Sequence, residues 1–278
     1  MHSVGAVGSV EFAHARLRAR WGSRADEATW RRIEVARELA PVLDLARSSA
    51  LARWVQELTP GSGVHPIEQA LRRRWCEQVA EVAGWMAAEW QPAIHWCEGL
   101  VDVPLLQAWV RGDPLPAWVA DDERLGDLLA GVSSGHTDGR AASTQAYGRP
   151  GAPASAWPAG AARVAAWLDA ANGQADALLP VWLQTWRALM PAGRARATLE
   201  RTLVPLLQAH ARRFADPATQ DGWAERRALG AQLVALMRRH AAEPIEAFVF
   251  LALQALELER LRAEIVGRAA LPRRTLHA

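Results

Sequence analysis

The stretch of sequence that decides the fold is residues 244–266, PIEAFVFLALQALELERLRAEIV. Its apolar residues recur mainly at intervals of three and four, which is the period of an α-helix and not the two-residue alternation of a strand. Pro244 suits the start of a helix, because the N–H that proline lacks has no helical partner there. The longest apolar run, residues 247–253, is far shorter than the ~20 residues of a membrane span. We therefore predict a long helix from Pro244 to about Val266.

Helical periodicity continues through most of the chain. Asp26 is expected to cap a helix that begins just after it, and Pro41 is expected to break or kink that segment. Residues 59–63, Thr-Pro-Gly-Ser-Gly, predict a turn, and residues 103–110 predict a short helix. No segment has the sustained period-two alternation of β-branched residues that a strand would need. The sequence predicts an all-α fold.

Residues 131–160 differ in character from the rest of the chain. Gly, Ala, Ser, Thr and Pro prevail there and the helical period is lost, which is typical of a flexible loop or linker. The predicted organisation is therefore one or more N-terminal helical lobes in residues 1–130, the loop in 131–160, and one or more C-terminal helical lobes in 161–278.

Composition narrows the range of functions. The chain has 278 residues, half of them hydrophobic and 22% charged, which suits a globular protein with a sizeable core. All 32 basic residues are arginines, so mechanisms that need a lysine amine are excluded, among them a Walker A nucleotidase, a protein kinase and a pyridoxal phosphate enzyme. The N-terminal residues lack the basic and apolar regions of a secretory signal.

Three patterns could carry catalytic or metal chemistry, and each has a plainer interpretation. His65, Cys76, His95 and Cys97 could be imagined as zinc ligands, but the two Trp-Cys pairs favour buried apolar positions. Residues 131–135 have the G-x-S-x-G spacing of a serine hydrolase, yet they follow an expected helix and not a strand. Residues 121–123, Asp-Asp-Glu, resemble the start of the aspartate-rich motif of all-α isoprenoid enzymes, but its third carboxylate would fall at Leu125, so we expect these acids to open a helix and face solvent. We predict no catalytic residue, no cofactor and no metal site.

Arginine and tryptophan offer further binding signals. The cluster at residues 72–74 could hold phosphates, but neighbouring acids and the net charge of +2 favour a solvated helix face, so no nucleic-acid partner is expected. The chain has 14 tryptophans, most of them on apolar stripes, while Trp118 and Trp157 lie near prolines and are expected to be more exposed. Tryptophan is enriched at the centres of protein interfaces, which favours a protein partner.

Within residues 243–277, Glu257, Leu261, Arg262, Ile265 and Arg268 lie at the offsets of a family signature. In this pattern the chain resembles the central-stalk subunit, called C or d, of V-type rotary ATPases. Shorter matches lie in the same order upstream, at residues 14–19, 67–71 and 101–106. Arg268 stands where the family usually has lysine, and the resemblance therefore implies a divergent bacterial member.

The resemblance implies a specific role. Such a subunit is a three-lobed helical funnel that joins the central shaft subunits to the membrane ring and transmits torque for ion or proton transport, with no catalysis of its own. It would lie on the cytoplasmic face of the inner membrane, as a peripheral protein held through the ring. The interface residues it would imply are Arg16, Arg18, Glu257, Arg262 and Arg268, where Glu257 and Arg262 could also pair within the tail helix. A general helical scaffold or adaptor is the alternative, and a serine or metal-dependent hydrolase is a less favoured one.

Overall fold

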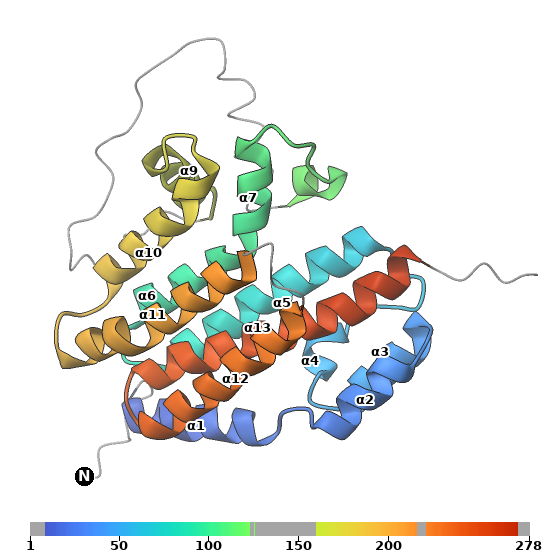
Figure 1. Ribbon diagram of the computed structural model, residues 1–278, viewed down its shortest axis with the longest axis horizontal. Helices are drawn as coiled ribbons and strands as arrows, with labels where there is room; N and C mark the ends of the chain where they lie inside the picture. Colours follow the sequence, from blue (N-terminus) through green and yellow to red (C-terminus); the bar gives the residue numbers. More distant parts are fainter. Residues whose placement is uncertain (1–8, 123–124, 126–159, 216–220, 272–278) are drawn as a thin grey trace, which may run out of the picture. The chain divides into compact units, whose positions relative to one another are not determined.

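The computed structural model describes residues 9–122, 125, 160–215 and 221–271 (Figure 1). Every regular element in these residues is an α-helix or a short 3-10 helix, and none of them is a strand. The predicted all-α class is therefore confirmed. The described helices form two compact units, the first from residues 1–87 and 192–278 and the second from residues 88–191.

The first unit contains the long helices of the chain. Helix α13 is the longest of those described, and α5 and α11 follow with 22 residues each. The bounds are α1 Val10–Gly22, α2 Glu27–Val35, α3 Leu39–Arg47, α4 Ala52–Val55, α5 Val64–Trp85, α11 Arg194–Ala215, α12 Gly222–Arg239 and α13 Ile245–Ala270.

Helix α13 is the centre of the first unit. It contacts α1, α3, α5, α11 and α12 (Figure 1). Its first two turns are buried on all sides, from Ile245 to Leu251, and its later turns bury one stripe that includes Leu261 and Ile265. Burying each such side chain stabilises the fold by roughly 1.5–3 kcal/mol. The apolar pattern of residues 244–266 therefore explains both the helix and its central position.

The second unit is built from shorter helices and several of the tryptophans. Trp96 Nε1 donates to the carbonyl of Trp182 at 3.0 Å, and Trp182 Nε1 donates to the carbonyl of Trp96 at 3.2 Å. Trp167 Nε1 donates to the carbonyl of Leu178 at 2.7 Å, so all three buried indoles have their polar atom satisfied. The bounds are α6 Gln91–Trp96, η1 Cys97–Asp102, α7 Val103–Val110, η2 Ala117–Asp121, α9 Gly160–Ala170, η4 Ala175–Ala177 and α10 Leu178–Leu189.

Several helix boundaries agree with the sequence signals. Asp26 caps α2, because its Oδ1 accepts from the backbone N–H of Thr29 at 2.7 Å. The break expected at Pro41 lies earlier, between Val35 and Leu39, and Pro41 belongs to the first turn of α3. Pro244 stands immediately before the first residue of α13.

Two expectations about burial are wrong. Val35 follows Trp30 and Ile33 in the apolar pattern that predicts this helix and was expected to be buried with them, yet it is 79% exposed at the last residue of α2. Trp118 was expected to be exposed near its prolines but is only 8% exposed. It lies in η2, which turns the indole inward. Trp157 lies outside the described residues.

The units also differ from the division expected from composition. A boundary at residues 131–160 separates two halves of the sequence, but residues 192–278 pack with residues 1–87 in one unit. Helix α13 is the physical reason, since its buried faces contact helices from the N-terminal third of the chain. We expected three similar lobes from the family resemblance, whereas the chain divides into two units.

Candidate functional site

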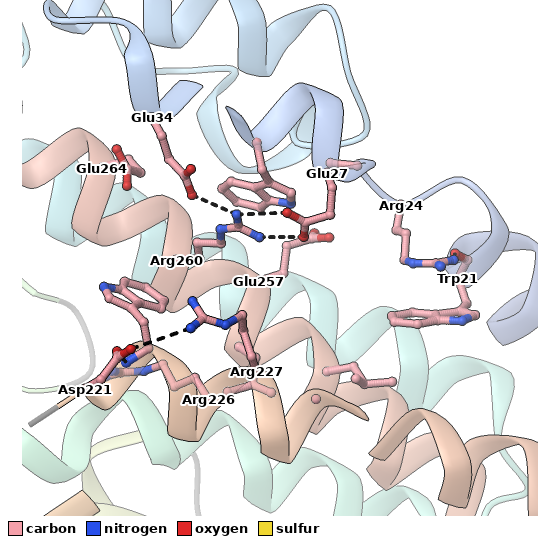
Figure 2. A pocket seen from close by; sticks show the side chains of 16 residues that line it. Trp21, Arg24, Glu27, Glu34, Asp221, Arg226, Arg227, Glu257, Arg260 and Glu264 are labelled. Atoms are coloured by element: carbon pink, nitrogen blue, oxygen red, sulfur yellow. Dashed lines mark hydrogen bonds and ion pairs between the residues drawn. The ribbon is translucent and has the colours of Figure 1, made fainter. Parts of the chain in front are cut away.

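The candidate site is a groove of about 560 Å³ in the first unit (Figure 2). This volume is in the range of ordinary ligand pockets. We call it the Arg–Trp groove. It is lined by the end of α1 and the turn after it (Trp21, Arg24, Ala25), by α2 (Glu27, Trp30, Glu34), by the start of α12 (Asp221, Trp223, Arg226, Arg227, Gly230) and by α13 (Leu253, Leu256, Glu257, Arg260, Glu264).

Local helix-capping signals place two of the groove's walls. Asp26 starts α2 at Glu27 and so places Trp30, which lines the groove, one turn later. On the other wall, Asp221 Oδ1 accepts from the backbone N–H groups of Trp223 and Ala224, both at 2.9 Å. This cap fixes the first turn of α12, which carries the tryptophan and arginines that line the groove.

Arg260 lies at the centre of the groove (Figure 2). Its guanidinium donates to both carboxylate oxygens of Glu27, at 2.9 and 3.3 Å, and to Glu34 at 2.7 Å. It also lies over the indole of Trp30, 4.4 Å from the ring centroid. The hydrogen bonds from Arg260 hold the pKa of Glu27 below its ordinary value of 4.5. This cluster joins α2 to α13 and keeps Glu27 ionised.

The rim of the groove carries two more arginine–aromatic stacks. Arg24 lies over Trp21, with its guanidinium carbon 4.3 Å from the ring centroid and Nη1 donating to the Trp21 carbonyl at 3.1 Å (Figure 2). Arg226 lies 4.3 Å from the Phe214 ring and 4.9 Å from the Trp223 ring. Phe214 and Trp223 are both exposed. Stacking leaves the in-plane N–H donors of a guanidinium free to bind oxygen anions.

Helix α13 holds three of the residues that the family resemblance implies. Glu257 lines the groove and Arg262 lies further along the same helix. The pair that these two residues could form within the helix is not present. Glu257 Oε1 instead accepts from Arg53 at 2.6 Å and from Trp54 Nε1 at 3.1 Å, and Arg262 makes a two-point ion pair with Glu68 at 2.6 and 2.9 Å. The spacing of five turns the two side chains toward different neighbouring helices.

Arg268 closes the C-terminal end of α2. It donates to the backbone carbonyls of Ile33 at 3.0 Å, Glu34 at 3.2 Å and Ala36 at 2.8 Å, and it pairs with Glu264 at 2.6 Å. The last carbonyls of a helix have no partner within that helix, so an arginine with several donors in a fixed plane is suited to this position.

The two residues of α1 that the family resemblance implies, Arg16 and Arg18, differ in their contacts. Arg18 Nε pairs with Glu246 at 2.6 Å and Nη2 donates to the carbonyl of Met237, also at 2.6 Å. Arg16 is exposed and lies 5.4 Å from the ring of Phe12. Four of the five proposed interface arginines and acids thus bind partners within the first unit. A contact of any of the five with another protein stays a prediction.

The other sequence candidates are only partly described. Ser133 and its glycines, together with Glu123, lie outside the described residues. Asp121 ends the short helix η2, so the expected helix start is not seen at this residue. Arg73 and Arg74 both pair with Glu57, and Arg74 also pairs with Glu77 at 2.6 Å, which is the solvated, balanced face that we predicted.

The four residues that were considered as zinc ligands do not lie in one unit. His65 and Cys76 belong to α5 in the first unit, whereas His95 and Cys97 belong to the second. Across the parts of the chain that the structure describes, no group of three or more His, Cys, Asp or Glu could hold a metal ion. Burial raises the pKa of the Cys97 thiol, and His95 Nδ1 lies 2.7 Å from Glu98.

The arginines of the groove rim were not predicted from the sequence. The signal that could have found them is the spacing Trp-x-x-Arg, which occurs twice in the chain, at residues 21–24 and 223–226. Both copies line the groove, and in both the arginine lies over the tryptophan ring. A side chain three residues after another can reach it across one helical turn.

Comparisons with known proteins give no match to this chain among family models, curated proteins or solved structures. Within the described ranges, no helix combines the length and the continuous apolar character that crossing a membrane requires.

Proposed function

We propose that this protein is a non-catalytic helical adaptor that holds a protein partner in the Arg–Trp groove. The observation that carries the proposal is the groove itself, where Arg24 and Arg226 lie over tryptophan rings with donor groups still available. Tryptophan and arginine are the residues most enriched at the energetic centres of protein interfaces. Their convergence from four separate segments favours a binding surface over a chance cluster.

The frame around the groove is suited to presenting a fixed surface. Ion pairs join α13 to α1 through Glu246, to α4 through Glu257, to α5 through Arg262 and to α2 through Arg260. Each pair is within 3 Å, and α13 itself is largely buried. Sites built on packed helices keep their geometry better than sites on loops, because close-packed interiors resist deformation.

The test is affinity purification of the tagged protein in parallel with two double variants. Arg24→Gln with Arg227→Gln removes two charges from the rim, and both side chains are exposed, so folding is expected to be kept. Arg201→Gln with Arg238→Gln removes two equally exposed arginines from residues that do not line the groove. A partner recovered by the wild type and the control, but lost by the rim variant, supports the adaptor function. Equal recovery by all three proteins counts against it.

A second candidate is the coupling subunit of a V-type rotary ATPase. The observation that favours it is the tail signature, whose Leu261 and Ile265 are fully buried and whose Glu257, Arg262 and Arg268 join α13 to three other helices. The two-unit division, where three similar lobes are expected, favours the general adaptor. Recovery of shaft and membrane-ring subunits with the tagged protein would establish this second function. Recovery of a different partner would refute it.

A further inference from the structure

The acidic side chains of the Arg–Trp groove are already bound to partners. Glu27 and Glu34 hold Arg260 at distances between 2.7 and 3.3 Å. Glu264 holds Arg268 at 2.6 Å, and Glu257 holds Arg53 at 2.6 Å. The fifth acid of the lining is Asp221, and one of its carboxylate oxygens caps α12 by accepting from two backbone N–H groups. Each of these acids is therefore engaged by an arginine or by a helix cap, and two of the arginines, Arg53 and Arg268, lie outside the groove lining.

The rim arginines have much weaker partners. No acid in the described residues lies within 4 Å of Arg24. Arg226 lies 3.9 Å from Glu259, and Arg227, which is 70% exposed, lies 3.6 Å from Asp221. The Arg227–Asp221 pair is exposed on both sides and contributes little, because water and salt screen it, whereas Arg226 is only 23% exposed and also lies over two aromatic rings. The donors that remain available in this groove therefore belong to cations.

Apolar surface lies beside these donors. Trp223 is exposed, and the partly exposed Leu256 of α13 lines the same groove beside the buried Leu253. A ligand that fits must offer oxygen anions to the rim and an apolar group between them. An acidic peptide segment, with Asp or Glu side chains separated by Leu or a similar residue, has this chemistry.

We infer that the occupant of the groove is an acidic, leucine-containing segment of the partner protein. This inference rests on the proposed adaptor function and specifies the class of its partner. A single carboxylate can meet Arg24, which has no acid within 4 Å in the described residues, whereas a carboxylate that meets Arg227 also lies near Asp221. The continuous phosphates of a nucleic acid would place more negative charge beside the acids of the lining, Glu34 and Glu264 among them. The acidic peptide is therefore the occupant that the charges favour.

The experiment measures fluorescence anisotropy of a fluorescein-labelled peptide, Glu-Glu-Leu-Glu-Glu-Leu-Glu-Glu, against the full chain. The peptide with Gln in place of every Glu is the matched probe for charge, and an oligothymidylate is the competitor. We expect the acidic peptide to bind, the Gln peptide to bind at least about tenfold more weakly, and Arg24→Gln with Arg227→Gln to raise the Kd of the acidic peptide at least about tenfold. The Arg201→Gln with Arg238→Gln control is expected to stay within about twofold of the wild type.

Three results would overturn the inference. They are equal binding of the Glu and Gln peptides, equal losses in the rim and control variants, and displacement of the acidic peptide by the oligothymidylate at a lower concentration than by unlabelled acidic peptide. If the double rim variant fails to fold, Arg24→Gln alone replaces it, since Arg24 lies in a turn and is exposed. Loss of a cellular partner in the rim variant, with no binding of the acidic peptide, would refute the acidic class and leave the adaptor function standing.

Discussion

The carboxylate of Glu246 provides a sharp test of how α13 is held in the first unit. It is only 1% exposed, and it lies 2.6 Å from both Arg18 Nε and His14 Nδ1 of α1. It also accepts from the backbone N–H of Ala242 at 3.0 Å. A buried acid with three partners contributes much of its stability through them, and removing it leaves each of them unpaired.

The expected cost of Glu246→Ala can be worked from these contacts. Breaking a buried ion pair by removing one member costs about 3–5 kcal/mol. Arg18 is 31% exposed and keeps its bond to Met237, so it can regain some hydration and the lower end applies, at about 3 kcal/mol. Glu246→Gln keeps an acceptor for Ala242 and loses only the charge, with an expected cost of about 1.5 kcal/mol.

The assay is urea unfolding followed by far-ultraviolet circular dichroism, with Arg16→Met as the control. Arg16 lies on the same helix as Arg18 but is exposed, and we expect its loss to cost less than about 0.5 kcal/mol. Arg18→Met should cost several times more. The double variant Arg18→Met with Glu246→Leu should lose clearly less free energy of unfolding than the sum of the two single variants, because apolar side chains then replace the whole ion pair. Strict additivity, or a Glu246→Ala cost below about 1 kcal/mol, would refute the reasoning.

Three further predictions concern the cap of α2, a histidine and the cysteines. Arg268→Ala should lower the free energy of unfolding, measured with urea, by about 2 kcal/mol, because several carbonyls at the end of α2 lose their donor. Arg268→Lys should recover only part of this loss, and full recovery by lysine would contradict the role of the planar guanidinium. Burial, followed by the charge of Arg226, lowers the pKa of His210 below its ordinary value of 6.5. The unfolded chain therefore binds this proton first, so the free energy of unfolding should fall as the pH drops below 6.5, and fall less in His210→Gln; parallel pH profiles would exclude the effect. Iodoacetamide should alkylate Cys76 in the native protein well before the buried Cys97, whose pKa burial raises, and mass spectrometry showing equal rates would contradict this placement.

The fold class and many helix boundaries were predictable because they depend on local signals. The period of residues 244–266 predicted α13, and the side chain of Asp26 predicted the start of α2. The grouping of helices was not predictable in the same way. It depends on which buried faces fit together, and no local pattern reports that residues 192–278 return to pack with residues 1–87.

The candidate site was only partly predictable for a similar reason. Glu257 was singled out, but the arginine that it binds, Arg53, lies about two hundred residues earlier in the sequence. Arg24 and Arg226 were missed, although each follows a tryptophan by three residues. That local spacing predicts a stack of two side chains, whereas the meeting of two such stacks in one groove depends on the tertiary packing of α1, α2, α12 and α13.

The most direct test of the adaptor function places a photocrosslinking amino acid at position 223 in the groove, and at position 201 of α11 as the control. Both side chains are exposed, and only the first lines the groove. After irradiation in cells, we expect one protein to be crosslinked at position 223 and not at position 201, and the crosslinked peptide to be rich in Asp and Glu. No crosslink at position 223, or the same products at both positions, would contradict it.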